Sequence, residues 1–212
     1  MDIAHKISHR KEFISKPQSF IKYIKKQRWI ENISMPMPII AVVGSRRSGK
    51  TTTVEAIVRG LTEKGYRVAT AKHIHEADFT IDTKGKDTWR HAQAGAKTIL
   101  SVAPNELTII KKVDTTEYDL NALVEQCEKE ADILILEGFR KLVAKNLTIP
   151  KVVTVKTAKE AAETSKYFKP ILAFAGSAKV EVRGLKIPEV DVPKEPQRLI
   201  EIIDKRVGPV IK

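Results

Sequence analysis

The chain has 212 residues, 42% of them hydrophobic, which is enough for one α/β domain with a buried core. Its formal net charge of +12 suits phosphate-rich ligands or nucleic acid and equally serves solubility. The single cysteine, Cys127, excludes an internal disulfide and a zinc site built from cysteines, and the apolar runs are too short to span a membrane, so we expect a cytoplasmic protein without a membrane partner.

The N-terminal segment, residues 1–37, is predicted to be a basic arm before the main domain. Residues 1–35 hold eight Lys or Arg side chains and three carboxylates, a net charge of +5. Apolar residues between Phe20 and Ile30 alternate with basic ones, as is typical of a short amphipathic helix. Two prolines, Pro36 and Pro38, end any helix there. This helix would either bind an acidic partner or pack on its own domain.

Beyond this arm, strand-like and helix-like patterns alternate. Strands are predicted over 39–43, 67–71, 98–102, 107–112, 132–136, 152–156 and 171–175, and helices over 50–64, 87–96, 117–130 and 194–206. Such alternation indicates βαβ units, a mainly parallel sheet and helices on both faces. We therefore expect residues 38–212 to form a three-layer α/β domain with ligands at the carboxyl ends of its strands.

The first predicted strand leads directly into a phosphate-binding sequence. Residues 44–51 follow the pattern G-x-x-x-x-G-K-[ST], in which the two glycines let the backbone aim its N–H groups at phosphate oxygens. Lys50 would reach the β- and γ-phosphates, and the hydroxyl of Thr51 would ligate Mg²⁺. The pattern predicts the P-loop NTPase fold and a nucleoside triphosphate site. The predicted nucleotide-binding residues are Gly44, Ser45, Arg46, Arg47, Ser48, Gly49, Lys50, Thr51 and Thr52.

Two arginines inside this loop, Arg46 and Arg47, stand where small or polar residues are more usual. Each either points to solvent or acts as an arginine finger, in its own site or across a dimer. The finger alternative predicts a large loss of hydrolysis, with nucleotide binding retained, on Arg46→Ala or Arg47→Ala.

The apolar strand over 132–136 ends in Glu137-Gly138-Phe139. In a parallel sheet its carboxyl end should lie beside the phosphate loop, where an acid holds Mg²⁺ directly or through water. Gly138 permits close approach of another group. Thr51 and Glu137 are therefore the predicted metal residues.

A second charged cluster begins with Lys72-His73-Ile74-His75 and continues through Gly85 to Arg90. The two histidines would point to the same side of an extended strand, but no third metal ligand is identifiable. The preferred interpretation is a basic cluster that faces an anionic ligand, formed by Lys72, His73, Lys86 and Arg90. Asp87 either caps the next helix or serves as a base. The candidate catalytic residues are Lys50, Asp87 and Glu137.

Taken together, these blocks resemble the molybdopterin-guanine dinucleotide biosynthesis protein B family. The matching residues are Gly44 through Thr52, Lys72-His73, Asp82, Gly85 through Thr88, Arg90, Ala94 through Ala96, Glu137 through Phe139 and Pro150-Lys151. The phosphate loop alone is shared by many families, whereas these blocks in this order are more specific. The basic arm lies outside the family pattern.

The resemblance implies a GTP-binding adapter of molybdenum (or tungsten) cofactor biosynthesis. Such an adapter assists a guanylyltransferase, protein A, in attaching GMP to molybdopterin, has weak GTPase activity of its own, uses Mg²⁺ and is a homodimer. In this chain the loop would bind the phosphates, and Thr51 and Glu137 would serve Mg²⁺. The neighbouring face toward the γ-phosphate or the pterin would be lined by Lys72, His73, Lys86, Asp87 and Arg90.

Three other functions are compatible with these residues. One is a P-loop kinase for a small metabolite, with Asp87 or Glu137 as base and Arg90 as phosphate clamp. Another is a metal-delivery GTPase that uses His73 and His75. The last, nucleic-acid binding through the basic arm, is not favoured, because no aromatic-basic pattern extends beyond the arm. The sequence has no Asn-Lys-x-Asp motif, so local motifs leave the choice between GTP and ATP open.

Overall fold

The computed structural model describes residues 37–116, 118–176, 184 and 186–211, so the predicted basic arm lies outside the described residues. The strands are β1 (Ile39–Gly44), β2 (Val68–Lys72), β3 (Thr98–Ala103), β4 (Glu106–Lys111), β5 (Ile133–Glu137), β6 (Lys151–Thr154), β7 (Ile171–Gly176) and β8 (Glu189–Asp191). The helices are α3 (Lys50–Glu63), α4 (Asp87–Gln93), α5 (Leu120–Glu125), α6 (Arg140–Val143), α7 (Ala158–Thr164) and α8 (Pro196–Ile211).

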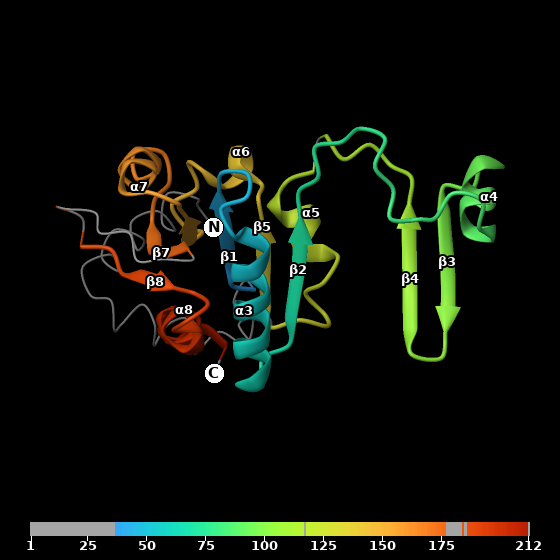
Figure 1. Cartoon of the computed structure of the whole chain (residues 1–212). Helices are drawn as coiled ribbons and strands as arrows, with labels where there is room; N and C mark the ends of the chain where they lie inside the picture. The colour runs from blue at the N-terminus through green and yellow to red at the C-terminus, as the bar shows by residue number, and fades with distance from the viewer. Residues whose placement is uncertain (1–36, 117, 177–183, 185, 212) are drawn as a thin grey trace, which may run out of the picture. The chain divides into compact units, whose positions relative to one another are not determined.

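Six of the strands form one sheet in the order β2-β5-β1-β6-β7-β8, and every pairing in it is parallel (Figure 1). The central strands β1, β5 and β6 are almost entirely buried, as expected of a parallel sheet covered on both faces. The predicted mainly parallel α/β fold is therefore confirmed. The order reverses at β1, and α/β sheets of this kind bind ligands at the carboxyl end of the strand where the order reverses.

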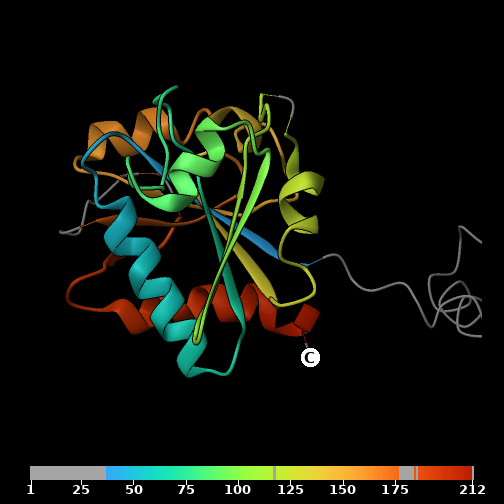
Figure 2. The same cartoon turned by 90° about the vertical axis from the view of Figure 1, so that its right-hand side faces the viewer.

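Helices α3 and α8 cover one face of the sheet and contact each other, and Figure 2 shows that they run at an angle to one another. Their apolar residues recur at helical spacing, and Ile57, Leu61, Leu199 and Ile203 are fully buried in one cluster. A second cluster on the other face includes Val143 of α6 and Ala161 of α7, with α5 packed against it. The sheet thus lies between two helical layers. Within the described part of the chain, no helix has the length and apolarity needed to cross a membrane.

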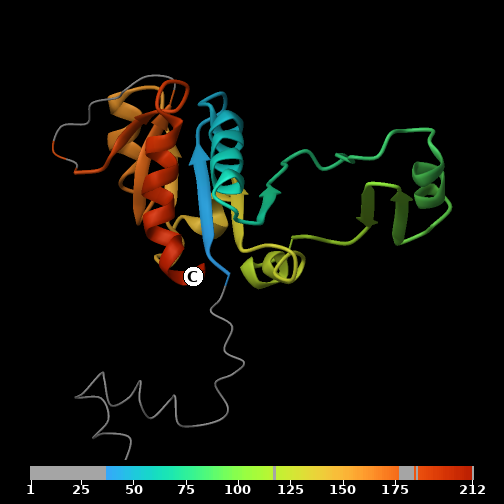
Figure 3. The ribbon, with the colours of Figure 1, turned by 90° about the horizontal axis from the view of Figure 1, so that it is seen from below.

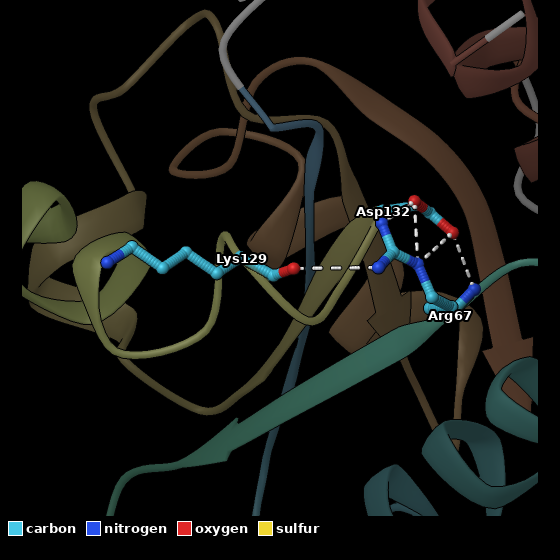
Figure 4. A network of polar contacts seen from close by, with 3 residues as sticks. All are labelled: Arg67, Lys129 and Asp132. Atoms are coloured by element: carbon cyan, nitrogen blue, oxygen red, sulfur yellow. Dashed lines mark hydrogen bonds and ion pairs between the residues drawn. The ribbon is translucent and has the colours of Figure 1, made fainter.

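An ion pair fixes the register between β2 and β5 at the start of both strands (Figure 4). The guanidinium of Arg67 donates to Asp132, with 2.6 Å from Nη2 to Oδ1, and the backbone N–H of Arg67 donates to Oδ2 at 2.8 Å. The hydrogen bonds from Arg67 hold the pKa of the Asp132 carboxyl below its usual value. With this end fixed, the pairing proceeds residue by residue and sets Lys72 opposite Glu137 at the carboxyl ends.

Strands β3 and β4 do not join the main sheet. They pair antiparallel as a separate two-stranded hairpin, and α4 lies against β3 (Figure 3). Both strands agree with the predicted ranges, but the two-residue connection Pro104-Asn105 is far too short for the crossover that a parallel pair requires. The antiparallel pairing follows from that connection.

Candidate functional site

The loop between β1 and α3 is built for close approach of a ligand to the backbone. Gly49 has a left-handed conformation with φ of 86°, and α3 begins at Lys50 without a side-chain cap. The first N–H groups of this 14-residue helix are therefore not capped by a side chain, as in helix N-termini that bind anions. A β-carbon at Gly44 would lie 2.1 Å from the Thr154 hydroxyl oxygen, so only glycine fits at the start of the loop.

Strand β6 supports this loop from the side through Thr154. Its hydroxyl lies 2.6 Å from Ser48 Oγ and donates to the carbonyl of Val43 at 3.2 Å. Ser48 in turn donates to the carbonyl of Ser45 at 2.8 Å. Thr154 is not among the residues predicted for the site, although one hydroxyl in the apolar run Val152-Val153-Thr154-Val155 is the signal that would have found it. The other loop residues Arg46, Arg47, Thr51 and Thr52 are exposed.

Lys50 folds back over the loop. Its Nζ donates to the carbonyl of Ser45 at 2.6 Å and to that of Gly44 at 3.3 Å. Burial lowers the pKa of Lys50 below its ordinary value. The charge of Glu137 acts in the opposite direction, and the charges of Arg140 and Lys72 lower it further. This ammonium group thus lies among other charged side chains at the carboxyl end of the sheet.

The carboxylate of Glu137, at the end of β5, contacts side chains of α3 and β2. It is only 9% exposed, and its Oε1 accepts from Thr51 Oγ1 of α3 at 2.9 Å. Lys72 Nζ of β2 lies 3.2 Å from the same oxygen. The structure therefore brings Glu137 beside the phosphate loop, where the sequence analysis expected the end of this strand. A hydroxyl and a carboxylate that meet in this way provide the oxygen donors that Mg²⁺ prefers.

Directly after Glu137 the chain turns through two left-handed residues. Gly138 has φ of 90° and Phe139 has φ of 50°, and the latter is uncommon for a side chain of this size. A β-carbon at Gly138 would lie 3.4 Å from the β-carbon of His73, so this turn and the end of β2 are in close contact. The turn starts α6 at Arg140, whose guanidinium lies 5.2 Å from the ring centre of Phe168. Arg140 is a second residue that the sequence analysis missed.

The two histidines of the metal-delivery alternative, His73 and His75, contact each other. The rings of His73 and His75 are 4.4 Å apart in an edge-to-face arrangement, and His73 also meets the ring of Phe139 at 5.2 Å. Burial, together with the charges of His75 and Lys141, lowers the pKa of His73. Among the described residues no group of three or more His, Cys, Asp or Glu side chains converges as a metal site. The pair therefore offers two ligands at most from that part of the chain.

The remaining candidates lie on α4, beside the hairpin. Asp87 is the first residue of α4, with Lys86 as the N-cap, and its 88% exposed carboxylate lies 3.8 Å from Arg90. The hydroxyl of the next residue, Thr88, donates to Asp82 Oδ1 at 2.8 Å. Within the described part of the chain, no hydrogen bond or ion pair links Lys86, Asp87 or Arg90 to the phosphate loop. The structure thus unites Lys50, Thr51, Lys72 and Glu137, but not these three.

The sheet order, together with a phosphate-loop sequence between the central strand and α3, defines an α/β protein of the P-loop NTPase-like class. Residues 39–177 match the family model of molybdopterin guanine dinucleotide synthesis protein B. The chain belongs to this family, and the resemblance inferred from the sequence is confirmed.

Individual relatives agree with this assignment. A relative from Methanocaldococcus jannaschii is 36% identical over 121 residues, which cover 57% of this chain and 48% of its own. The molybdopterin-guanine dinucleotide biosynthesis adapter protein of Haemophilus influenzae is 30% identical over 106 residues, 50% of this chain and 58% of its own. The chain thus spans only about half the length of these relatives. A crystal structure of molybdopterin-guanine biosynthesis protein B superposes with a TM-score of 0.61 at 27% identity, over 80% of this chain and 99% of that one.

Proposed function

We propose that this chain is a GTP-binding adapter with weak GTPase activity in molybdenum (or tungsten) cofactor biosynthesis. It would assist a guanylyltransferase, protein A, in attaching GMP to molybdopterin or its metal-loaded form. The observation that carries the proposal is the meeting of Thr51 and Glu137 at a P-loop, in a chain of this family. A cytoplasmic location fits GTP as the ligand and the single, half-buried thiol of Cys127.

The triphosphate would lie in the loop from Gly44 to Thr52, against its backbone N–H groups and the start of α3. Lys50 would leave its two loop carbonyls and pair with phosphate oxygens, which carry more negative charge than those carbonyls. Arg140 and Lys72 add positive charge at the same end of the sheet. These cations would compensate the charge of the nucleotide.

Thr51 and Glu137 fit Mg²⁺, because their oxygens already meet at 2.9 Å and one of them is a nearly buried carboxylate. The metal would supply neutralisation of charge on the phosphates. Lys72 forms an ion pair with the same Oε1 of Glu137 in this structure and would turn toward the phosphates when a nucleotide binds. Positioning and charge neutralisation of this kind are what slow phosphoryl transfer to water needs from a protein.

The proposal is tested by titrating GTP and Mg²⁺ into the full chain by calorimetry, followed by co-purification with the guanylyltransferase. GTP binding that is tighter in Mg²⁺ than in EDTA, and recovery of the guanylyltransferase with the chain, are the expected results. Absence of GTP binding would refute the proposal. Phosphoryl transfer that depends on an added metabolite alcohol would favour a kinase instead.

Replacing Glu137 with glutamine is expected to lower the Mg²⁺ affinity of the GTP complex, while the affinity for GTP itself changes little. The amide keeps the side-chain volume but removes the charge that would hold Mg²⁺, so the Mg²⁺ affinity of the GTP complex should fall by about tenfold or more. GTP affinity measured in EDTA should stay the same or rise, because one negative charge near the phosphates is lost. Glu163→Gln, on the exposed side of α7, serves as the control. Equal Mg²⁺ affinity in both variants would contradict the metal role.

A homodimer is the second part of this proposal, and the exposed face of the hairpin supports it. Leu100 and Val102 of β3 lie directly opposite Ile109 and Leu107 of β4, and all four are 51–80% exposed. The other face differs, because Ile99 is buried. A two-stranded sheet is marginally stable by itself, and an apolar face of this kind marks an interaction surface. A second copy of the chain would cover it with the same four residues.

Exchanging Val102 for lysine together with Leu107 for glutamate should convert the dimer into a monomer. The two new charges are opposite and face each other across the strands, so the hairpin is retained while its apolar face is lost. Sedimentation velocity at micromolar concentration measures the change. Leu147→Lys, at another exposed leucine, should leave the dimer intact. A monomeric parent chain, or a double variant that still dimerises, would contradict this surface.

A further inference from the structure

The last strand of the sheet ends in a buried carboxylate that the proposed site has not used. Asp191 of β8 is only 4% exposed. Its Oδ2 lies 3.1 Å from Lys194 Nζ, an ammonium on an 80% exposed side chain. Its Oδ1 is buried and has no hydrogen-bond donor within the part of the chain that the structure describes.

A charged oxygen in this position carries a cost in free energy. Burying a carboxylate without donors is unfavourable, and natural proteins rarely leave such an atom unpaired. The ion pair with Lys194 does not remove the cost, because it uses the other oxygen and its lysine lies in water. An unpaired, buried acceptor is therefore a feature that a ligand with N–H groups would satisfy.

The sheet register places Asp191 along the same edge as the phosphate loop. Gly44 pairs with Thr154, Thr154 with Ala175, and Ala175 with Val190, so one row of residues crosses four strands. Asp191 follows this row by one residue. With strands about 4.8 Å apart, it stands three strands, or about 14 Å, from the start of the loop. That is the order of distance by which the base of an extended nucleotide is separated from its β-phosphate.

The side chain of Asp191 lies on the opposite face of the sheet from the side chains of Val190 and Val192. Val190 and Val192 are both buried in the cluster formed with α3 and α8. Since successive residues of a strand alternate between faces, Asp191 is turned away from that cluster. Asp191 is the last residue of β8, the edge strand of the sheet, and parallel α/β sheets bind their ligands at the carboxyl ends of their strands.

We propose that Asp191 reads the guanine base of the bound nucleotide. Guanine presents two donors side by side, the ring N1–H and the exocyclic 2-amine, and a carboxylate is an acceptor that can pair with both. Adenine has no donor at N1 and no 2-amine, so it would leave Oδ1 unsatisfied. A site built around a buried acceptor rejects the ligand that lacks the matching donor. This inference rests on the proposed function and adds the residue that would make it selective for GTP.

The test is Asp191→Asn in the full chain, with affinities for GTP and XTP measured by calorimetry in Mg²⁺. Xanthine carries a carbonyl in place of the 2-amine, and an asparagine amide can accept from N1–H while donating to that carbonyl. We expect GTP affinity to fall at least about tenfold and XTP affinity to rise by a similar factor. The matched control is Glu189→Gln, two residues earlier on the same strand, which should keep the selectivity of the parent chain.

A second measurement uses only the parent chain, so it tests the proposal even if Asp191→Asn does not fold. The parent chain should bind ITP, which lacks the 2-amine, about tenfold more weakly than GTP, and should bind ATP more weakly still. Equal affinity for GTP and ITP, or an Asp191→Asn chain that folds and keeps the parent's ratio of GTP to XTP affinity, would overturn the role of Asp191 while leaving GTP binding standing. A parent chain that binds no GTP would overturn the proposed function and this inference with it.

Discussion

Replacing Lys50 with alanine is expected to weaken GTP binding by at least about 100-fold, or ~2.8 kcal/mol. The ammonium group lies at the loop, within reach of two backbone carbonyls, and is the side chain expected to pair with the phosphates. Removing one partner of such a charge pair leaves the phosphate charge uncompensated, which is costly. Calorimetry with GTP and Mg²⁺ measures the loss, and GTP turnover should fall with it.

The control for this prediction is Arg59→Ala. Arg59 is an exposed cation on the same helix, so its removal changes the net charge of the chain by the same amount away from the loop. We expect its GTP affinity to stay within a factor of about two of the parent. If Lys50→Ala and Arg59→Ala bound GTP equally well, the loop would not be the nucleotide site. Lys50→Met, which keeps the apolar stem, separates the loss of charge from a loss of packing.

The elements around the loop could be predicted from sequence because local and tertiary preferences agree there. The strand predicted over 39–43 is observed as Ile39–Gly44, and the helix predicted over 50–64 as Lys50–Glu63. A continuous apolar run, a glycine-rich turn and apolar residues at helical spacing each indicate the same arrangement. The position of Glu137 beside Thr51 followed from the same reasoning, since parallel strands end at one edge.

The elements that were missed are short or depend on distant contacts. Helix α7 has seven residues, and its start is marked only by Thr157, whose hydroxyl accepts from the N–H of Glu160 at 3.2 Å. That Thr-x-x-Glu spacing is the sequence signature of a capping box and would have predicted the helix, although Glu160 accepts from the N–H of Lys156 and not from that of Thr157. Strand β8 has three residues, too few for a periodic pattern. The helix predicted over 117–130 is confined to Leu120–Glu125.

The parts of the site that escaped prediction come from pairs far apart in sequence. Thr154 and Ser48 are 106 residues apart and meet at 2.6 Å because β6 lies beside β1. Asp191 looks like one acid among many until its burial and its unpaired oxygen are known. Asp87 is a candidate base from its neighbours in sequence alone, and only the fold shows that its carboxylate is exposed on α4. Sequence motifs indicate local geometry, whereas burial and partners require the fold.

Gly44→Ala is expected to be among the most destabilising single methyl additions in this chain. The added β-carbon would lie 2.1 Å from Thr154 Oγ1, 2.4 Å from the Thr154 carbonyl and 2.7 Å from Ser48 Oγ. The carbonyl belongs to the backbone of β6, which is paired with β1 at this point, so it cannot move without breaking the central sheet. We expect the free energy of unfolding to fall by about 3 kcal/mol or more.

Urea unfolding of the parent and the variant measures this loss, and two further variants separate its causes. Gly65→Ala adds a methyl group at φ of 89° with no atom within 4 Å, so it should cost only about 1 kcal/mol through backbone strain. Adding Thr154→Ala to Gly44→Ala removes the hydroxyl clash but leaves the backbone carbonyl at 2.4 Å, so stability should recover only in part. If Gly44→Ala were as stable as Gly65→Ala, β6 would not be packed tightly against the phosphate loop. The inference that Thr154 supports the site would then be wrong.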